Sequence, residues 1–250
     1  MVAGQRDEGM TLIELIIVIA LSAFLILGLV QIASAASSST RLQRNQAQIQ
    51  EHARLAVNTL TDVIRQTGFT PQPWSEQYPS LGLAENSLDN VSAISDRLAV
   101  RSWSDLNCFN NLNPEKDSSG NASFYIREFV FDLNSDNGLT QQCRFGPSLT
   151  KLTTQVRRQG FIQGVESFQV LYGRDSDLDG NIETWVKAGQ WIDSLNILGV
   201  KIGLLLVSQD AVSEKEPKNH VVLDSTLSSR ADGKLRRMIQ FTVAIKGRTG

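Results

Sequence analysis

Residues 9–14 read Gly-Met-Thr-Leu-Ile-Glu, and the chain continues from Leu15 to Ile32 with almost no polar interruption. An apolar run of about 20 residues is long enough to cross a bilayer as a helix that rises about 1.5 Å per residue. Glu14 lies inside this run. An ionisable side chain costs about 3 kcal/mol or more within a membrane, so its presence indicates a function that depends on a partner.

The segment Gly9–Glu14, followed by the apolar run, resembles the processing site of type IV pilins and type II secretion pseudopilins. The resemblance implies that a prepilin peptidase removes residues 1–9 as a leader, cutting between Gly9 and Met10. The same enzyme would then methylate the new N-terminus at Met10. Two features depart from the family pattern. Met10 stands where the family usually has Phe, and the leader balances one arginine with two acidic residues instead of being basic.

The resemblance also implies an assembly role for Glu14, whose carboxylate would pair with the N-terminal amine of a neighbouring subunit. A carboxylate in a low dielectric is tolerated when a cation pairs with it, and buried polar groups fix register in coiled coils. Two alternatives remain open. Glu14 could lie unpaired at the headgroup boundary, or the run could be a secretory signal cleaved after Ala33-Ser34-Ala35. Such signals have shorter apolar regions, and this one contains a carboxylate.

The helix is predicted to continue beyond the membrane, from about Met10 to Thr67, with Gly68 as its stop. After a patch of small residues, apolar side chains recur at helical spacing on one stripe. These are Leu42, Ile49, Ala53, Ala56, Leu60 and Val63. We therefore divide the mature chain into a membrane-spanning or filament-core helix at 10–33, an amphipathic continuation at 34–68 and a β-rich globular domain at 69–250.

Strand signals dominate the later part of the chain, where β-branched and aromatic residues alternate with polar ones. The predicted strands are Arg97–Trp103, Phe124–Leu133, Phe161–Tyr172, Ile182–Lys187, Val200–Leu206 and Phe241–Ile245. Such alternation is typical of an antiparallel sheet with one covered face. The fold class is therefore α+β. In the terms of the family resemblance, it is a type IV pilin-like fold: a long N-terminal helix, membrane-spanning in its first half, packed on an antiparallel sheet.

The segment Gly164–Gly173, with the sequence GVESFQVLYG, is similar to a signature of PilW-like minor pilins. The Asp-rich loop after it and the late LRR…FTVAI ending strengthen this resemblance. The processing site alone indicates only a pilin-like protein, whereas the second half indicates the minor-pilin branch.

The chain has two cysteines, Cys108 and Cys143. If the membrane helix keeps its N-terminus in the cytoplasm, the globular domain lies in the periplasm or beyond, where thiols are oxidised. We therefore predict a Cys108–Cys143 disulfide; the alternative is two separate buried thiols.

An acidic loop is the clearest site-like constellation, with Asp175, Asp177, Asp179, Asn181 and Glu183. It begins like a calcium loop, in which alternating carboxylates converge and a glycine permits the turn. The twelfth position, where an EF-hand needs a bidentate Glu, is Val186. A partial Ca²⁺ loop is the hypothesis, and a solvated acidic hairpin is the alternative; no other cofactor is expected.

The formal net charge of −2 gives no general attraction to nucleic acid, so we expect no nucleic-acid partner. A weak basic cluster near the C-terminus is interpreted as a solvated strand edge. It comprises Arg230, Lys234, Arg236, Arg237, Lys246 and Arg248. No arrangement of nucleophile and base is evident, and we expect no enzymatic activity.

The resemblance implies a minor pilin that helps to initiate pilus assembly and supports twitching motility and adhesion. Its partners would be prepilin peptidase, other minor pilins, the major pilin, the inner-membrane assembly platform and a tip adhesin. It would lie in the bacterial inner membrane as a single-pass protein and later in the extracellular pilus. Two alternatives stay open: a type II secretion pseudopilin, and a membrane-anchored module that adheres through calcium or contacts DNA.

Overall fold

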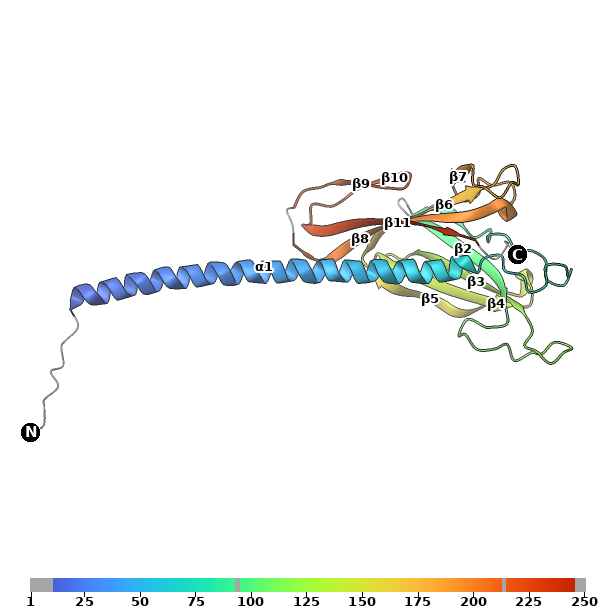
Figure 1. Ribbon diagram of the computed structural model, residues 1–250, viewed down its shortest axis with the longest axis horizontal. Coiled ribbons are helices and arrows are strands. Elements are labelled where there is room, and N and C mark those ends of the chain that lie inside the picture. Colours follow the sequence, from blue (N-terminus) through green and yellow to red (C-terminus); the bar gives the residue numbers. More distant parts are fainter. Residues whose placement is uncertain (1–10, 93–94, 213–214, 246–250) are drawn as a thin grey trace, which may run out of the picture. The chain divides into compact units, whose positions relative to one another are not determined.

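The computed structural model describes residues 11–92, 95–212 and 215–245. Its contacts divide the chain into two compact units, one ending at Arg44 and the other beginning at Asn45. The first unit consists of the N-terminal part of helix α1 (Leu12–Arg65). The second contains the end of α1 and all of the strands (Figure 1).

Helix α1 ends where the sequence predicts a stop. Its last residue is Arg65, and the N–H groups of Gln66 and Thr67 donate to carbonyls three residues earlier. Gly68 then adopts a φ of +76°, a conformation that glycine reaches without a Cβ clash. The predicted start at Met10 lies outside the described residues.

In the second unit, α1 buries one stripe of side chains against the sheet. The buried residues are Asn45, Ile49, Ala56, Leu60 and Ile64. Ala53 and Val63, which the spacing placed on this stripe, are only partly buried and flank it. Asn45 is buried although it is polar, because its Oδ1 accepts a hydrogen bond from the backbone N–H of Asp210 at 3.3 Å.

Among the described residues, nine strands form one sheet and two form another. The larger sheet contains β1 (Leu88–Ser92), β2 (Ser95–Ser104), β3 (Tyr125–Leu133), β4 (Gly138–Gly146), β5 (Thr153–Gln163), β6 (Val165–Arg174), β7 (Thr184–Val186), β8 (Ile197–Ala211) and β11 (Lys234–Ala244). The smaller sheet is the hairpin of β9 (Asn219–Val222) and β10 (Ser225–Ser228). Short 3₁₀ turns lie at Leu149–Lys151 and Ser194–Asn196.

The larger sheet has the order β11-β8-β6-β2-β3-β4-β5, with β1 beside β2 and β7 beside β6. Its pairings are antiparallel except at the centre, where β2 and β6 run parallel. That junction has one register pair, Ser95 with Phe168. The predicted α+β class, with a long N-terminal helix and a mostly antiparallel sheet, is confirmed.

Two predicted strands need correction. The segment Phe161–Tyr172 is two strands, because Gly164 has a φ of +74° and separates β5 from β6. A Cβ at Gly164 would lie 2.7 Å from the carbonyl oxygen of Val207, so the turn also requires a close backbone approach. The strand predicted at Ile182–Lys187 is limited to the three residues of β7.

The main core lies between α1 and the sheet. Its largest fully buried side chains include Phe131, Phe168 and Tyr172, which come from β3 and β6. Leu98 and Val100 of β2 point to the same face. The residues between these core positions on β2 and β3 point to the opposite face of the sheet. That face does not pack against α1 and can carry polar side chains.

Candidate functional site

The first unit of the chain presents an almost wholly apolar surface from Leu12 to Ile32. Every residue from Thr11 to Arg44 is exposed in the isolated chain. The large apolar side chains among them are Leu12, Ile13, Leu15, Ile16, Ile17, Val18, Ile19, Leu21, Phe24, Leu25, Ile26, Leu27, Leu29, Val30, Ile32 and Leu42. Within the described residues, α1 is the one helix long and apolar enough to cross a membrane. Exposed apolar patches of this kind mark surfaces that another apolar phase covers.

Three hydroxyl groups on this helix form hydrogen bonds with its own backbone. Ser22, Ser38 and Thr40 each donate to a backbone carbonyl three or four residues earlier, at 2.7–2.9 Å. Their polar hydrogens are therefore satisfied within the helix itself. This leaves Glu14 as the acidic residue of the apolar segment.

Glu14 lies in the first turn of α1, where a carboxylate interacts favourably with the helix dipole. Its backbone N–H lies 3.4 Å from Thr11 Oγ1, and the Leu15 N–H donates to the Thr11 carbonyl at 3.2 Å. Within the described part of the chain, no cation pairs with the Glu14 carboxylate. The predicted cleavage and methylation site, Gly9 and Met10, lies outside the described residues.

The predicted disulfide joins Cys108 to Cys143, which connects the loop between β2 and β3 to strand β4. The Cys108 N–H also donates to Gln155 Oε1 at 3.0 Å. Arg127 of β3 donates to Asn110 Oδ1 at 3.1 Å, so side chains from two further strands hold the same loop.

The acidic loop between β6 and β7 brings its carboxylates together. One oxygen from each of Asp175, Asp177, Asp179 and Glu183 lies within 4.8 Å of the others. Asp175 is buried, and its two oxygens accept the N–H groups of Leu178 and Gly180, whereas the other three residues are exposed.

The remaining predicted calcium ligand, Asn181, lies in the same loop. Its backbone N–H and its side-chain amide both donate to Asp179, and these hydrogen bonds hold the pKa of Asp179 below its usual value. The loop therefore carries converging oxygen ligands of the type that Ca²⁺ prefers, and calcium binding stays a prediction.

The basic cluster near the C-terminus is not a uniformly solvated strand edge. The Arg236 side chain is 5% exposed and pairs with Glu166 of β6 at 2.7 Å and with Asp232 at 2.8 Å. Arg237, the next residue on β11, is exposed as expected. The charge of Arg236 is compensated within the fold, because the side chain reaches from β11 across β8 to the carboxylate on β6.

Comparison with known families gives two matches. Residues 4–30 match the prokaryotic N-terminal methylation motif, a range that includes Gly9, Met10 and Glu14. Residues 136–247 match the family described as type IV pilus-assembly protein W. This second match begins before β4 and extends beyond β11.

Among solved structures, the chain is similar to a type IV-like pilin from Thermus thermophilus, with 15% identity and a TM-score of 0.48. The alignment covers 79% of this chain and 97% of that one. No curated protein matches the chain at a significant level. The two family matches together define its identity, because one contains the processing region and the other contains the second half of the sheet. The chain therefore contains a domain of the type IV pilus-assembly protein W family and an N-terminal methylation motif, which support a PilW-like type IV pilin.

Proposed function

We propose that this protein is a non-enzymatic subunit built into a type IV pilus, where it helps to initiate filament assembly. The observation that carries the proposal is the exposed apolar surface of α1 from Leu12 to Ile32, with one carboxylate at Glu14. A surface of this kind is stable in two environments, the hydrocarbon of a membrane and the interior of a helical filament. Transfer between them keeps the apolar side chains out of water.

The first step is processing at the membrane. Prepilin peptidase would cut between Gly9 and Met10 and methylate the new amine, which removes residues 1–9 and creates a cationic chain end. The N-terminus of the precursor would be cytoplasmic and the second unit periplasmic. In that orientation the Cys108–Cys143 disulfide lies in an oxidising compartment, where such bonds form and persist.

The second step is selection of the neighbouring subunit through Glu14. An unpaired carboxylate in hydrocarbon is costly, and a cation at the same depth removes most of that cost. The methylated amine of Met10 from an adjacent pilin would supply that cation. The pairing would therefore fix the axial register of each added subunit. Contacts between apolar side chains would stabilise the packing of the helices but would not define their register.

The partners in this process would be other minor pilins, the major pilin and the inner-membrane assembly platform. A complex of minor pilins would form first and then accept major pilin, which places this subunit near the filament tip beside an adhesin. Twitching motility and adhesion would follow from the filament that the complex initiates.

The test is incorporation of a Glu14→Gln variant into filaments. Gln keeps the size and polarity of the side chain but removes the charge that would attract the amine. Cleaved protein should accumulate in the membrane fraction, and its recovery in sheared pili should fall at least about tenfold, as expected for the loss of a buried charge pair. Glu51→Gln is the matched control, because Glu51 lies in the second unit and its carboxylate is exposed to solvent.

Normal recovery of Glu14→Gln in sheared pili would overturn the proposed pairing. A deletion strain separates the pilus from the secretion alternative. Loss of pili with unchanged exoprotein secretion supports the proposal, whereas normal pili with blocked secretion would assign the chain to a type II secretion filament.

A further inference from the structure

The face of the sheet that points away from α1 carries two charged rows across β2, β3, β4 and β5. The strand register places Arg101, Glu128, Arg144 and Thr154 in one row. The other row contains Asp132 and Thr140, with Arg97 and Arg158 bound to Asp132. A neutral row of Ala99, Val130 and Gln142 separates them.

Each charged row has a carboxylate on the central strand β3 and an arginine on each side. Glu128 and Asp132 are 2% and 5% exposed, so water solvates their carboxylates poorly. Their negative charges therefore depend on these arginines for stabilisation. Asp132 accepts Arg158 Nε at 2.8 Å on one oxygen and Arg97 Nε at 3.2 Å on the other. Four guanidinium groups therefore face two carboxylates, which leaves two positive charges on this face.

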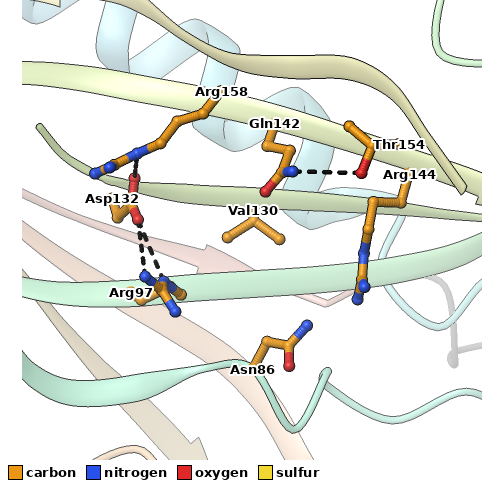
Figure 2. A pocket seen from close by; sticks show the side chains of 8 residues that line it. All are labelled: Asn86, Arg97, Val130, Asp132, Gln142, Arg144, Thr154 and Arg158. Carbon is orange, nitrogen blue, oxygen red and sulfur yellow. Dashed lines mark hydrogen bonds and ion pairs between the residues drawn. The ribbon is translucent and has the colours of Figure 1, made fainter. Parts of the chain in front are cut away.

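A pocket of about 310 Å³ opens over the neutral row. Figure 2 shows Val130 at its centre, with Arg97 and Arg158 on one side and Arg144 on the other. Asp132, which lies between Arg97 and Arg158, together with Asn86 and the pair of Gln142 and Thr154, completes the lining. The walls are charged and polar, and the floor is a single aliphatic side chain.

The arginine side chains are held in place by ion pairs, but some of their guanidinium donors form no hydrogen bond among the described residues. Arg144 donates from Nε to Glu128 at 2.9 Å and also from Nη2. Within the described residues, the Nη1 atoms of Arg97, Arg144 and Arg158 have no hydrogen-bond partner. Their donors are therefore available, and the side chains are already ordered by the carboxylates beneath them, which lowers the entropy cost of binding an anion.

The fourth arginine, Arg101, lies opposite Glu128 in the strand register and does not line the pocket. Arg101 donates to the Leu83 carbonyl at 3.1 Å, and its buried Nε has no partner among the described residues. Burial lowers the pKa of Arg101 from its usual value, because the charged form is poorly solvated there. The nearby Glu85 is exposed, so water and salt screen its charge.

We propose that this pocket binds the phosphate group of a small polar phosphomonoester. A phosphomonoester carries nearly two negative charges at neutral pH, which matches the two excess positive charges of the face. Guanidinium donors approach the pocket from both charged rows, and a tetrahedral anion offers oxygens in several directions, whereas a planar carboxylate does not. The volume exceeds that of a bare phosphate, so part of the carrier molecule would rest on Val130 and the amide groups. This site does not depend on the assembly role of α1.

The test is titration calorimetry on the full-length protein in a neutral, phosphate-free detergent. Glucose 6-phosphate should bind at millimolar concentrations or below, and glucose should give no heat. Affinity should rise as the pH increases from 5 to 7.5, because the second ionisation of the phosphate has a pKa near about 6. Dimethyl phosphate and glucuronate, which carry one negative charge each, should bind more weakly and show no such rise.

Two variants at neighbouring positions of β5 distinguish binding in the pocket from a nonspecific effect of the protein's positive charge. Arg158→Gln removes one donor, but Asp132 remains paired with Arg97, so the fold should persist. It should weaken glucose 6-phosphate binding about tenfold or more, as expected for a lost charged hydrogen bond. Arg157→Gln removes the same charge from the adjacent exposed position, which does not line the pocket, and should leave affinity unchanged.

Three results would overturn the proposal: no binding of glucose 6-phosphate by the wild type, equal weakening by both variants, or equal affinity for glucuronate. Circular dichroism confirms folding of each variant. If Arg158→Gln unfolds, Arg97→Gln provides the same test, because Asp132 then keeps Arg158. Normal piliation with failed phosphate binding rejects this site and leaves the assembly function intact.

Discussion

The carboxylate of Asp96 accepts a hydrogen bond from the backbone N–H of Val170 at 2.8 Å, which joins β2 to β6 where the sheet has its single parallel pairing. The other carboxylate oxygen accepts the N–H of Asn90 in β1 at 3.0 Å. Asp96 is 3% exposed. The Asp96 side chain therefore adds hydrogen bonds at the junction of β2 and β6, where the backbone pairing is limited to one register pair.

This buried carboxylate predicts a pH dependence of stability. Burial raises the pKa of Asp96 from 3.8 to about 6, despite the two backbone donors. The folded state binds this proton more tightly than the unfolded state, so stability falls as the pH rises from about 4 to 6 and then levels off. The loss attributable to Asp96 between pH 4.5 and 7 should be about 2 kcal/mol.

The measurement is urea unfolding of the full-length protein in neutral detergent, followed by tryptophan fluorescence. Asp96→Asn should lack this part of the slope, whatever its absolute stability. Asp136→Asn, at an exposed turn, should retain the wild-type slope. An unchanged slope in Asp96→Asn would show that other groups cause the pH dependence.

The mature N-terminus gives the sharpest check on processing. Mass spectrometry of protein isolated from cells should find a chain that begins at Met10 and carries one methyl group. Gly9→Val should block cleavage and leave residues 1–9 attached, because the peptidase would no longer recognise its site. A native chain beginning at Ala36, or an uncut precursor in mature pili, would contradict the assignment.

The Arg236 cluster predicts a large effect from one substitution. Arg236→Met should lower the free energy of unfolding by about 3 kcal/mol or more, because it leaves Glu166 and Asp232 without their partner. Hydrogen bonds from Arg236 also hold the pKa of Asp232 far below its usual value. Arg237→Met, at the neighbouring exposed position, should change stability by less than about 0.5 kcal/mol. Equal effects in urea unfolding would refute the buried cluster.

The disulfide should stabilise the second unit. Cys108 and Cys143 are 35 positions apart, and the chain-entropy estimate for a loop of this size is about 4 kcal/mol. The Cys108→Ser/Cys143→Ser double variant should unfold at lower urea and be cleaved faster by protease in the loop after β2. A reducing agent should destabilise the wild type to the level of the double variant and leave that variant unchanged; insensitivity of the wild type would exclude a structural role.

Calcium binding by the acidic loop can be measured directly. If the loop is a site, titration calorimetry should show a dissociation constant of about 10⁻⁴–10⁻³ M, typical of extracellular modules. Asp177→Asn should abolish the heat, and Asp136→Asn should not. The absence of heat in the wild type would leave the loop as a solvated acidic turn.

The sequence predicted those features that depend on neighbouring residues. The helix stop at Gly68 follows from local backbone conformation, and the strand at β3 follows from its alternating apolar residues. Strand β4 was not predicted, because polar side chains on its outer face interrupt the apolar pattern of its sequence. The break at Gly164 was missed because strand-like residues continue on both sides of it.

By itself, the sequence determined the apolar helix, its acidic residue and the helix-plus-sheet class, because hydrophobic length and periodicity are properties of contiguous residues. Only the tertiary structure decided that Arg97 and Arg158 share Asp132, that Arg236 is buried between Glu166 and Asp232, and that Asp96 joins β2 to β6. Each of these contacts joins different strands or the turns beside them. Strand order and register bring them together, and local patterns encode neither.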